Sequence, residues 1–139
     1  MQVELPSDQR FAYLVGLGKV LSMGSQEVTS TVLPLAGAGM GLSPTQIEDV
    51  VRAVHEANSV QEALTGLTDP IAGRMLVQQL ILLANADRDY DAAERAGVRV
   101  VADVLGFASE FVSQMEMWVA EGLAWQDRGR ELVQAGRLA

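Results

Sequence analysis

Two apolar segments joined by a short acidic turn constrain the fold of this chain more than any other feature. Residues 75–86 are almost all apolar, residues 87–94 carry four acids, and an apolar pattern resumes as far as Leu105 and Gly106. Apolar residues that recur every three or four positions indicate a helix with one buried face. The stretch 75–107 is therefore predicted to form a helix, an acidic turn and a second helix.

Helix-start signals divide much of the remaining chain into further helices. A Ser or Asp side chain can accept a hydrogen bond from the first free backbone N–H groups, and Pro fits the first helical turn. Such signals stand at Ser43-Pro44-Thr45-Gln46, Ser59-Val60-Gln61-Glu62 and Thr68-Asp69-Pro70. Together with a first helix over about 8–22 and a last one from about residue 110, they predict short connections between helices.

The run 28–35 is the one stretch that resembles a strand. It is rich in β-branched residues, and Pro34 lies inside it. Pro disfavours a helix interior, while β-branched residues favour strands. A helix and a strand followed by the glycine-rich loop 37–41 both remain open for this run.

Because only that run is strand-like, the sequence predicts an all-α fold, a compact bundle of about seven helices. The chain has 139 residues, which suits a single domain over 1–139. Residues 121–139 are expected to form a C-terminal helical extension, frayed or separate from the helix before it. An apolar pattern on nearly every side of residues 71–86 predicts that this helix is surrounded by others.

The chain also contains a weak internal repeat. A shift of 65 positions places Gly41 on Gly106 and aligns apolar residues of the two halves, among them Val54 with Val119. This indicates one helical unit used twice. The four acids of residues 87–94 occur only in the second half.

Composition excludes several classes of function. The formal net charge is −8, which on average repels nucleic acid and anionic membrane surfaces, so no nucleic-acid partner is expected. The chain has no cysteine, which excludes disulfides and thiolate metal sites. No long uncharged apolar run or signal peptide is recognisable, so we expect no integral membrane segment and a cytoplasmic location.

The segment 86–94 reads Ala-Asp-Arg-Asp-Tyr-Asp-Ala-Ala-Glu, and Leu105-Gly106 follows it. These residues resemble the tellurite-resistance TerB-like domain family. The pattern of that family is an apolar helix ending in Ala-Asp-Gly, then an apolar residue, an Asp or Ser, two residues and a Glu, before a helix ending near Leu-Gly. Here Ala86, Asp87, Tyr90, Asp91 and Glu94 match it, with Leu105-Gly106 following. The glycine is replaced by Arg88, and Asp89 is an added acid.

This resemblance covers about residues 8–120. It implies an all-helical domain of two related halves, a binding or stress-response role, and a divalent cation at the acidic turn. The implied ligands are Asp87, Asp91 and Glu94, with Asp89 as an additional carboxylate.

The turn's own chemistry allows two interpretations. Carboxylates at Asp87, Asp89, Asp91 and Glu94 supply the oxygen ligands that Ca²⁺ or Mg²⁺ prefers. No His or Cys is near to favour zinc. The spacing of the acids does not match an EF-hand loop. Alternatively, Asp91 and Glu94 form a capping box, and Arg95 pairs with Asp91 one helical turn away. A cation site and simple capping both remain open.

Nothing in the sequence defines an enzyme or a cofactor site. His55 is the only histidine, and the segment 37–41 lacks the Gly-Lys-Ser/Thr ending of a phosphate loop. Metal-assisted hydrolysis through Asp87 and Asp89 is the opposing hypothesis to a non-catalytic binding module. A purely structural interaction domain without metal is a third.

Large flexible or aromatic side chains in the last helix suggest a binding surface. Trp118 and Trp125 are seven residues apart, and Met115 lies about one helical turn before Trp118. Such side chains suit partner binding when they are exposed. We expect a protein partner or self-association through Met115, Trp118 and Trp125.

Overall fold

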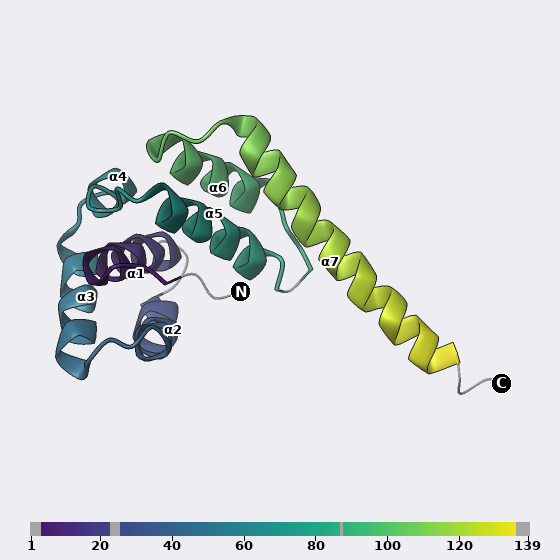
Figure 1. Ribbon diagram of the computed structural model, residues 1–139, viewed down its shortest axis with the longest axis horizontal. Helices are drawn as coiled ribbons and strands as arrows, with labels where there is room; N and C mark the ends of the chain where they lie inside the picture. Colours follow the sequence, from purple (N-terminus) through teal and green to yellow (C-terminus); the bar gives the residue numbers. More distant parts are fainter. Residues whose placement is uncertain (1–3, 23–25, 87, 136–139) are drawn as a thin grey trace. The chain divides into compact units, whose positions relative to one another are not determined.

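The computed structural model describes residues 4–22, 26–86 and 88–135, and for residues 26–32 it describes the backbone alone. The described residues form α-helices and no strand, which confirms the all-α prediction (Figure 1). The helices are α1 (Ser7–Ser22), α2 (Gln26–Gly39), α3 (Pro44–Glu56), α4 (Val60–Ala63), α5 (Pro70–Ala84), α6 (Ala92–Val104) and α7 (Ser109–Ala135).

The run 28–35 lies in α2, so the strand alternative is wrong. Pro34 is inside the helix, where it removes one backbone hydrogen bond. Tertiary packing outweighs this cost, because Leu33 is fully buried. Gly37 lies so close to Ile47 of α3 that a Cβ atom there would come within 2.8 Å of Ile47 Cγ1. Because Gly37 has no side chain, α2 can approach α3 closely at this contact.

The predicted helix starts are confirmed by their hydrogen bonds. Ser43 caps α3, and its hydroxyl accepts from Gln46 N at 3.2 Å while Gln46 Oε1 accepts from Ser43 N at 2.8 Å. Ser59 accepts from Glu62 N at the start of α4. Asp69 Oδ1 accepts from Ile71 N ahead of α5. Local sequence therefore determines where these helices begin.

The described residues up to Val77 form one compact unit around α1, which lies among α2, α3 and α4 (Figure 1). Leu14 and Leu17 of α1 are buried in its core with Val50 and Val54 of α3. Gly18 allows α1 to approach the side chains of Val54 and Leu33 closely. The core of this unit is therefore aliphatic and tightly packed.

One polar side chain is buried in the same unit and ties α1 to the loop before α5. Gln9 is 6% exposed, and its Oε1 accepts from Thr68 N at 3.1 Å and Asp69 N at 2.9 Å. Its Nε2 donates to Gly66 O at 3.2 Å and to Thr68 Oγ1 at 3.2 Å. Because the buried amide of Gln9 makes these hydrogen bonds to the α4–α5 loop, Gln9 ties that loop to α1.

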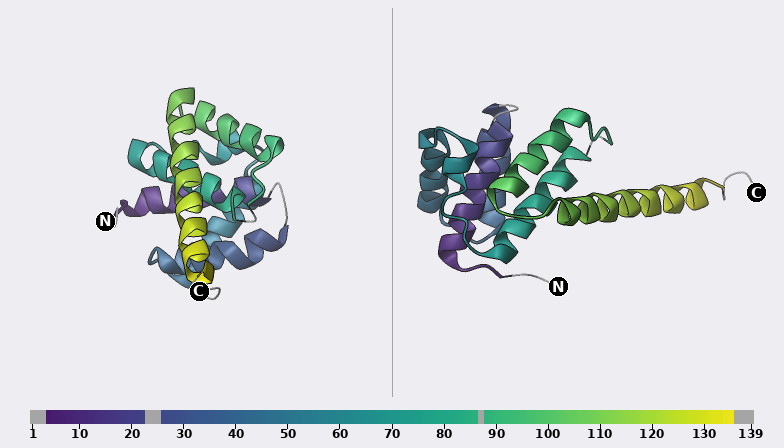
Figure 2. Two further views of the ribbon diagram at one scale, coloured as in Figure 1. Left: turned by 90° about the vertical axis from the view of Figure 1, so that its right-hand side faces the viewer. Right: turned by 90° about the horizontal axis from the view of Figure 1, so that it is seen from above.

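The described residues from Gln78 onward form a second unit, in which α6 packs against the first half of α7. Val98 and Val101 of α6 are buried, as are Val112 and Val119 of α7. The second half of α7 continues past α6 as an uninterrupted helix (Figures 1 and 2). The prediction of a separate helix beyond about residue 121 is therefore wrong, because α7 is continuous as far as Ala135.

The internal repeat is visible in the helices. A shift of 65 residues carries the start of α3 onto the start of α7, and it carries the bounds of α1 and α2 to within three residues of those of α5 and α6. Gly41 and Gly106 are one repeat apart, and both adopt positive φ, 81° and 82°, after a helix. Glycine adopts this left-handed conformation without a steric cost. The repeated unit is thus a pair of helices, a glycine turn and a third helix.

The exposure of α5 and the character of the helices bear on two further expectations, a fully surrounded α5 and the absence of a membrane segment. Ile71 is 49% exposed and Leu82 is 39% exposed, so α5 is not buried on all sides as predicted. Among the described residues, no helix has both the length and the apolar character needed to cross a membrane. The single domain over 1–139 stays a prediction.

Candidate functional site

The acidic turn between α5 and α6 was the predicted cation site. Asp87 lies outside the described residues. Asp89 and Asp91 are exposed, and Glu94 is in the first turn of α6. Within the described residues, no group of three or more His, Cys, Asp or Glu side chains is arranged to hold a metal ion. The ligand set of Asp87, Asp89, Asp91 and Glu94 stays a prediction.

The capping interpretation of the same residues is confirmed. Asp91 Oδ1 accepts from Glu94 N at 2.7 Å, and Glu94 Oε1 accepts from Asp91 N at 3.1 Å. This capping box satisfies free N–H groups at the start of α6 and places negative charge at the positive end of the helix. Each interaction uses one oxygen of its carboxylate.

Arg88 occupies the position of the glycine in the family pattern, and its backbone adopts a conformation that favours glycine. Its φ angle is +63°, in the left-handed region. Its guanidinium pairs with Asp127 of α7 at 2.8 Å, so the side chain anchors the turn to α7. The turn therefore keeps the shape of a glycine turn although a non-glycine residue occupies it.

Replacing Arg88 therefore separates backbone strain from charge pairing. We expect Arg88→Gly to be more stable than Arg88→Ala by about 1 kcal/mol, because both lose the ion pair but only alanine retains the left-handed cost. Ala96→Gly on the exposed side of α6 is the control. Glycine in a helix is unfavourable, so this variant is expected to be less stable than the parent by about 1 kcal/mol. Urea denaturation measures both; equal stability of the two Arg88 variants would contradict the strain argument.

A charged cluster beside the turn was not predicted. The carboxylate of Glu116 on α7 is 11% exposed and accepts from Tyr90 Oη at 2.7 Å and from Arg99 Nη2 at 3.0 Å. Arg95 Nη1 lies 3.5 Å from the same carboxylate, and its guanidinium lies 4.5 Å from the centre of the Tyr90 ring. Arg95 and Arg99, one turn apart on α6, were the sequence signal for this cluster.

The acidic turn contacts α7 at two places, one inside this cluster and one outside it. Tyr90 lies between Asp89 and Asp91 and binds Glu116, while Arg88 binds Asp127 three helical turns further along. Arg95 contacts Tyr90 and Glu116, which differs from its predicted pairing with Asp91. These side-chain contacts therefore hold the acidic turn against α7.

The pKa of Tyr90 provides a test of the cluster. Burial raises this pKa above its ordinary value of 10.0, and the hydrogen bond to Glu116 and its charge raise it further. A raised pKa in the folded state means that its contribution to stability is present below about pH 10 and is lost as pH rises through the folded pKa. We expect the free energy of unfolding to fall less steeply above pH 10 in Tyr90→Phe than in the parent.

A control for alkaline unfolding is available in the other tyrosine. Burial raises the pKa of Tyr13 to about 12, so Tyr13→Phe measures the slope that comes from a tyrosine outside the cluster. Chemical denaturation at several alkaline pH values gives both slopes. A Tyr90→Phe slope identical to that of the parent would contradict the assigned environment.

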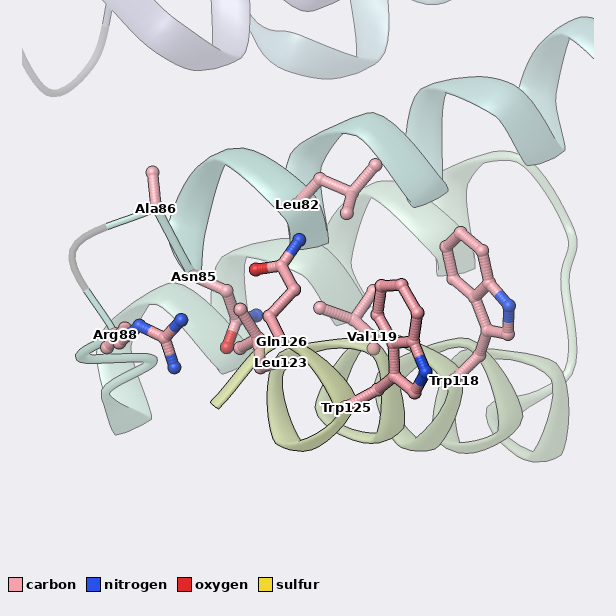
Figure 3. A pocket seen from close by; sticks show the side chains of 10 residues that line it. Leu82, Asn85, Ala86, Arg88, Trp118, Val119, Leu123, Trp125 and Gln126 are labelled. Atoms are coloured by element: carbon pink, nitrogen blue, oxygen red, sulfur yellow. The ribbon is translucent and has the colours of Figure 1, made fainter. Parts of the chain in front are cut away.

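A groove lies beside the same turn, between the end of α5 and the middle of α7. It has a volume of about 440 Å³ and is lined by Leu82 and Asn85 on one side and by Trp118, Gly122 and Trp125 on the other. Both indoles rise from the same side of α7 (Figure 3). Trp118 is 53% exposed and Trp125 is 77% exposed.

Met115 differs from the two tryptophans of the predicted binding surface. It is only partly exposed, and its sulfur accepts a weak hydrogen bond from Gln78 Nε2 at 3.7 Å. The exposed part of the predicted surface therefore consists of Trp118 and Trp125. Arg88 reaches the groove from the acidic turn, which places the two candidate sites next to each other.

Comparison with known proteins identifies the family. A family model described as "Tellurite resistance protein TerB" matches residues 26–116, more than half of the chain. This match extends from the start of α2 into α7 and includes the acidic turn. No curated protein and no solved structure matches the chain. The family match confirms the resemblance noted at the acidic turn, and the chain belongs to the TerB tellurite-resistance family.

Proposed function

We propose that this chain acts as a binding module in a TerB-type stress response, and that a protein partner docks in the groove of α7. The observation that carries the proposal is the pair of exposed indoles, Trp118 and Trp125, on either side of Gly122. Leaving two large aromatic side chains in water forgoes the gain from burying them. A protein surface that contacts a partner recovers this gain on binding.

The groove has the features of a binding hot spot. Tryptophan is enriched among residues that dominate binding energy, especially where a concave surface excludes water. The lining of the groove combines two indoles with the polar side chains of Asn85, Arg88 and Gln126. Such polar groups fix the orientation of a partner whose apolar side chain enters between the indoles.

The proposal is tested by the ability to protect cells against tellurite. A bacterial strain that lacks its own TerB-family protein would express the parent, Trp118→Ala with Trp125→Ala, or Leu35→Ala. Leu35 is an exposed apolar residue of α2 and serves as the matched control. We expect the double variant to lose protection while Leu35→Ala retains it. Full protection by a folded double variant would overturn the groove as the working surface.

A cation at the acidic turn is a second candidate function. It is supported by the capping geometry, because Asp91 and Glu94 each use one oxygen in the capping box and have another. Asp89 is exposed in the same turn. We propose that Asp87, Asp89, Asp91 and Glu94 bind Ca²⁺ or Mg²⁺, because carboxylate oxygens suit these hard cations better than zinc.

This candidate can be separated from capping with conservative variants. Asn at Asp91 and Gln at Glu94 retain capping, whereas both lose carboxylate charge. Ca²⁺ or Mg²⁺ is expected to raise the unfolding temperature of the parent. At a cation concentration of a hundred times the dissociation constant, the free energy of unfolding should rise by about 2.7 kcal/mol. The shift should be lost in Asp91→Asn with Glu94→Gln and in Asp87→Asn with Asp89→Asn. No shift with any cation, or a larger one with zinc, would refute the site.

The proposed role involves no catalysis. A binding module needs a surface and a partner, and both candidates above supply only binding. The opposing hypothesis is metal-assisted hydrolysis at Asp87 and Asp89. Turnover of a generic phosphate or ester substrate by the parent, abolished in Asp87→Asn, would favour an enzyme over the proposed role.

A further inference from the structure

We propose that the groove of α7 binds a second copy of this chain, and that the two α7 helices pack antiparallel. The inference rests on the proposed function, because it names the occupant of the same groove. Three observations carry it: a seven-residue apolar repeat on α7, open space at two glycines of that repeat, and opposite charges beside it.

The apolar repeat continues along most of α7. Large apolar residues recur every seven positions at Phe111, Trp118, Trp125 and Leu132. A second series, four residues after each of the first three, is Met115, Gly122 and Gly129. Together they alternate by four and three residues, which is the spacing of helices that pack against another helix. Leu132 is 67% exposed, so the stripe remains exposed beyond the groove.

The glycines provide holes for the large side chains. Nothing lies within 4 Å of the position of a Cβ atom at Gly122 or Gly129. In helix packing, a side chain of one helix enters a hole formed by four residues of the other. Around Gly122 these four are Trp118, Glu121, Gly122 and Trp125, and the groove lies there.

An antiparallel arrangement fits a large residue of one copy into each small site of the other. Trp125 of one copy meets Gly122 of the second, and Trp118 meets Gly129. Leu132 then meets Met115. A parallel pair would instead set Gly122 against Gly122 and Trp125 against Trp125, leaving voids next to overcrowded layers. The alternation of size therefore favours the antiparallel pair, whose two-fold symmetry makes the surface complementary to itself.

The charges beside the stripe favour the same arrangement. Glu121 and Arg128 occupy the same edge of the stripe, one repeat apart, and both are exposed. In the antiparallel pair described above, Glu121 of each copy lies opposite Arg128 of the other. A parallel pair would place Gln126 opposite Glu121 and Val133 opposite Arg128. Two opposite-charge contacts thus form only in the antiparallel register.

The experiment is sedimentation equilibrium of the full chain over a range of concentrations. We expect the parent to associate to a dimer and Gly122→Gln to remain a monomer, because its side chain fills the hole. Open space at Gly122 and the low helix propensity of glycine mean that this variant should fold at least as stably as the parent. Gly97→Gln is the control: Gly97 also has open space, lies on α6 outside the stripe, and its variant should dimerise like the parent.

A charge exchange tests the register. Glu121→Arg and Arg128→Glu should each weaken the dimer, since each brings like charges together. An equal mixture of the two variants should associate more tightly than either alone. In the mixed dimer, Arg at 121 of one variant meets Glu at 128 of the other, and the unchanged Arg128 of the first meets the unchanged Glu121 of the second. The double variant should also regain the dimer.

The outcomes separate this inference from the proposed function. A monomeric parent at every concentration, or a dimer unaffected by Gly122→Gln, would overturn the self-association. Absence of recovery in the mixture of charge variants would overturn the antiparallel register. If the parent is monomeric while the tryptophan double variant loses tellurite protection, the groove binds a different protein, and only the present inference fails.

Discussion

Replacing Gln9 with alanine is expected to lower the free energy of unfolding by about 2–4 kcal/mol, the largest effect expected of a single polar substitution here. Gln9 is buried and accepts hydrogen bonds from the backbone N–H groups of Thr68 and Asp69. It also donates to Gly66 O. Alanine would remove these hydrogen bonds and leave a small cavity where the buried Gln9 side chain lies, so both costs add.

Urea denaturation monitored by circular dichroism measures this loss, with Gln61→Ala as the matched control. Gln61 is an exposed glutamine of α4, and removal of an exposed side chain changes stability by less than about 0.5 kcal/mol. Similar stability of the Gln9 and Gln61 variants would contradict the role assigned to Gln9 in fixing the α4–α5 loop.

Replacing Glu116 with alanine is expected to lower the free energy of unfolding by about 2 kcal/mol. Removing one partner of a fully buried ion pair costs about 3–5 kcal/mol. The expected loss is smaller here, because the side chains of Arg95 and Arg99 are 50% and 37% exposed and water screens their charge. Loss of the acceptor for the Tyr90 hydroxyl adds to the effect.

A graded series of variants checks this cluster by the same denaturation measurement. Glu116→Gln keeps an oxygen that can accept from Tyr90 and should lie between the parent and Glu116→Ala. Glu131→Ala removes an exposed acid from the same helix and is expected to have little effect. If Glu116→Ala is no less stable than Glu131→Ala, the cluster does not hold the acidic turn on α7.

The helix starts and the internal repeat were predictable because local sequence determines them. Ser43 and Asp91 bind N–H groups within three residues, so the chemistry of capping can be recognised without tertiary structure. Gly41 and Gly106 could be aligned for the same reason, since each ends a helix in a conformation that favours glycine. Features that depend on a few neighbouring residues are therefore accessible from sequence.

The strand-like character of α2 was misleading because tertiary packing outweighs local propensity. Burial of Leu33 and the contact between Gly37 and Ile47 are made by residues on other helices, which periodicity alone does not identify. Gln9 was missed for a similar reason: its partners Thr68 and Asp69 are 59 and 60 residues away. Long-range contacts decide both cases.

The candidate site was only partly predictable. The acids of the turn and the two tryptophans were recognisable by residue type and spacing, yet an apolar stripe on a helix has the same pattern whether it is buried or exposed. Trp118 and Trp125 are exposed although Val112 and Val119 of the same helix are buried, and no local pattern indicates which side of α7 is packed. The connection from Tyr90 to Glu116 likewise required the packing of α6 on α7.

Tryptophan fluorescence measures the central claim most directly, because Trp118 and Trp125 are the only two tryptophans and both line the groove. In a dilute solution of the full chain, we predict the emission spectrum of water-exposed indoles and ready quenching of that emission by iodide. At higher concentration, or with a docked partner, emission should move to shorter wavelength and quenching should fall. Indoles already protected from iodide at the lowest concentration, with no change on concentrating the protein, would contradict a groove that is open for binding.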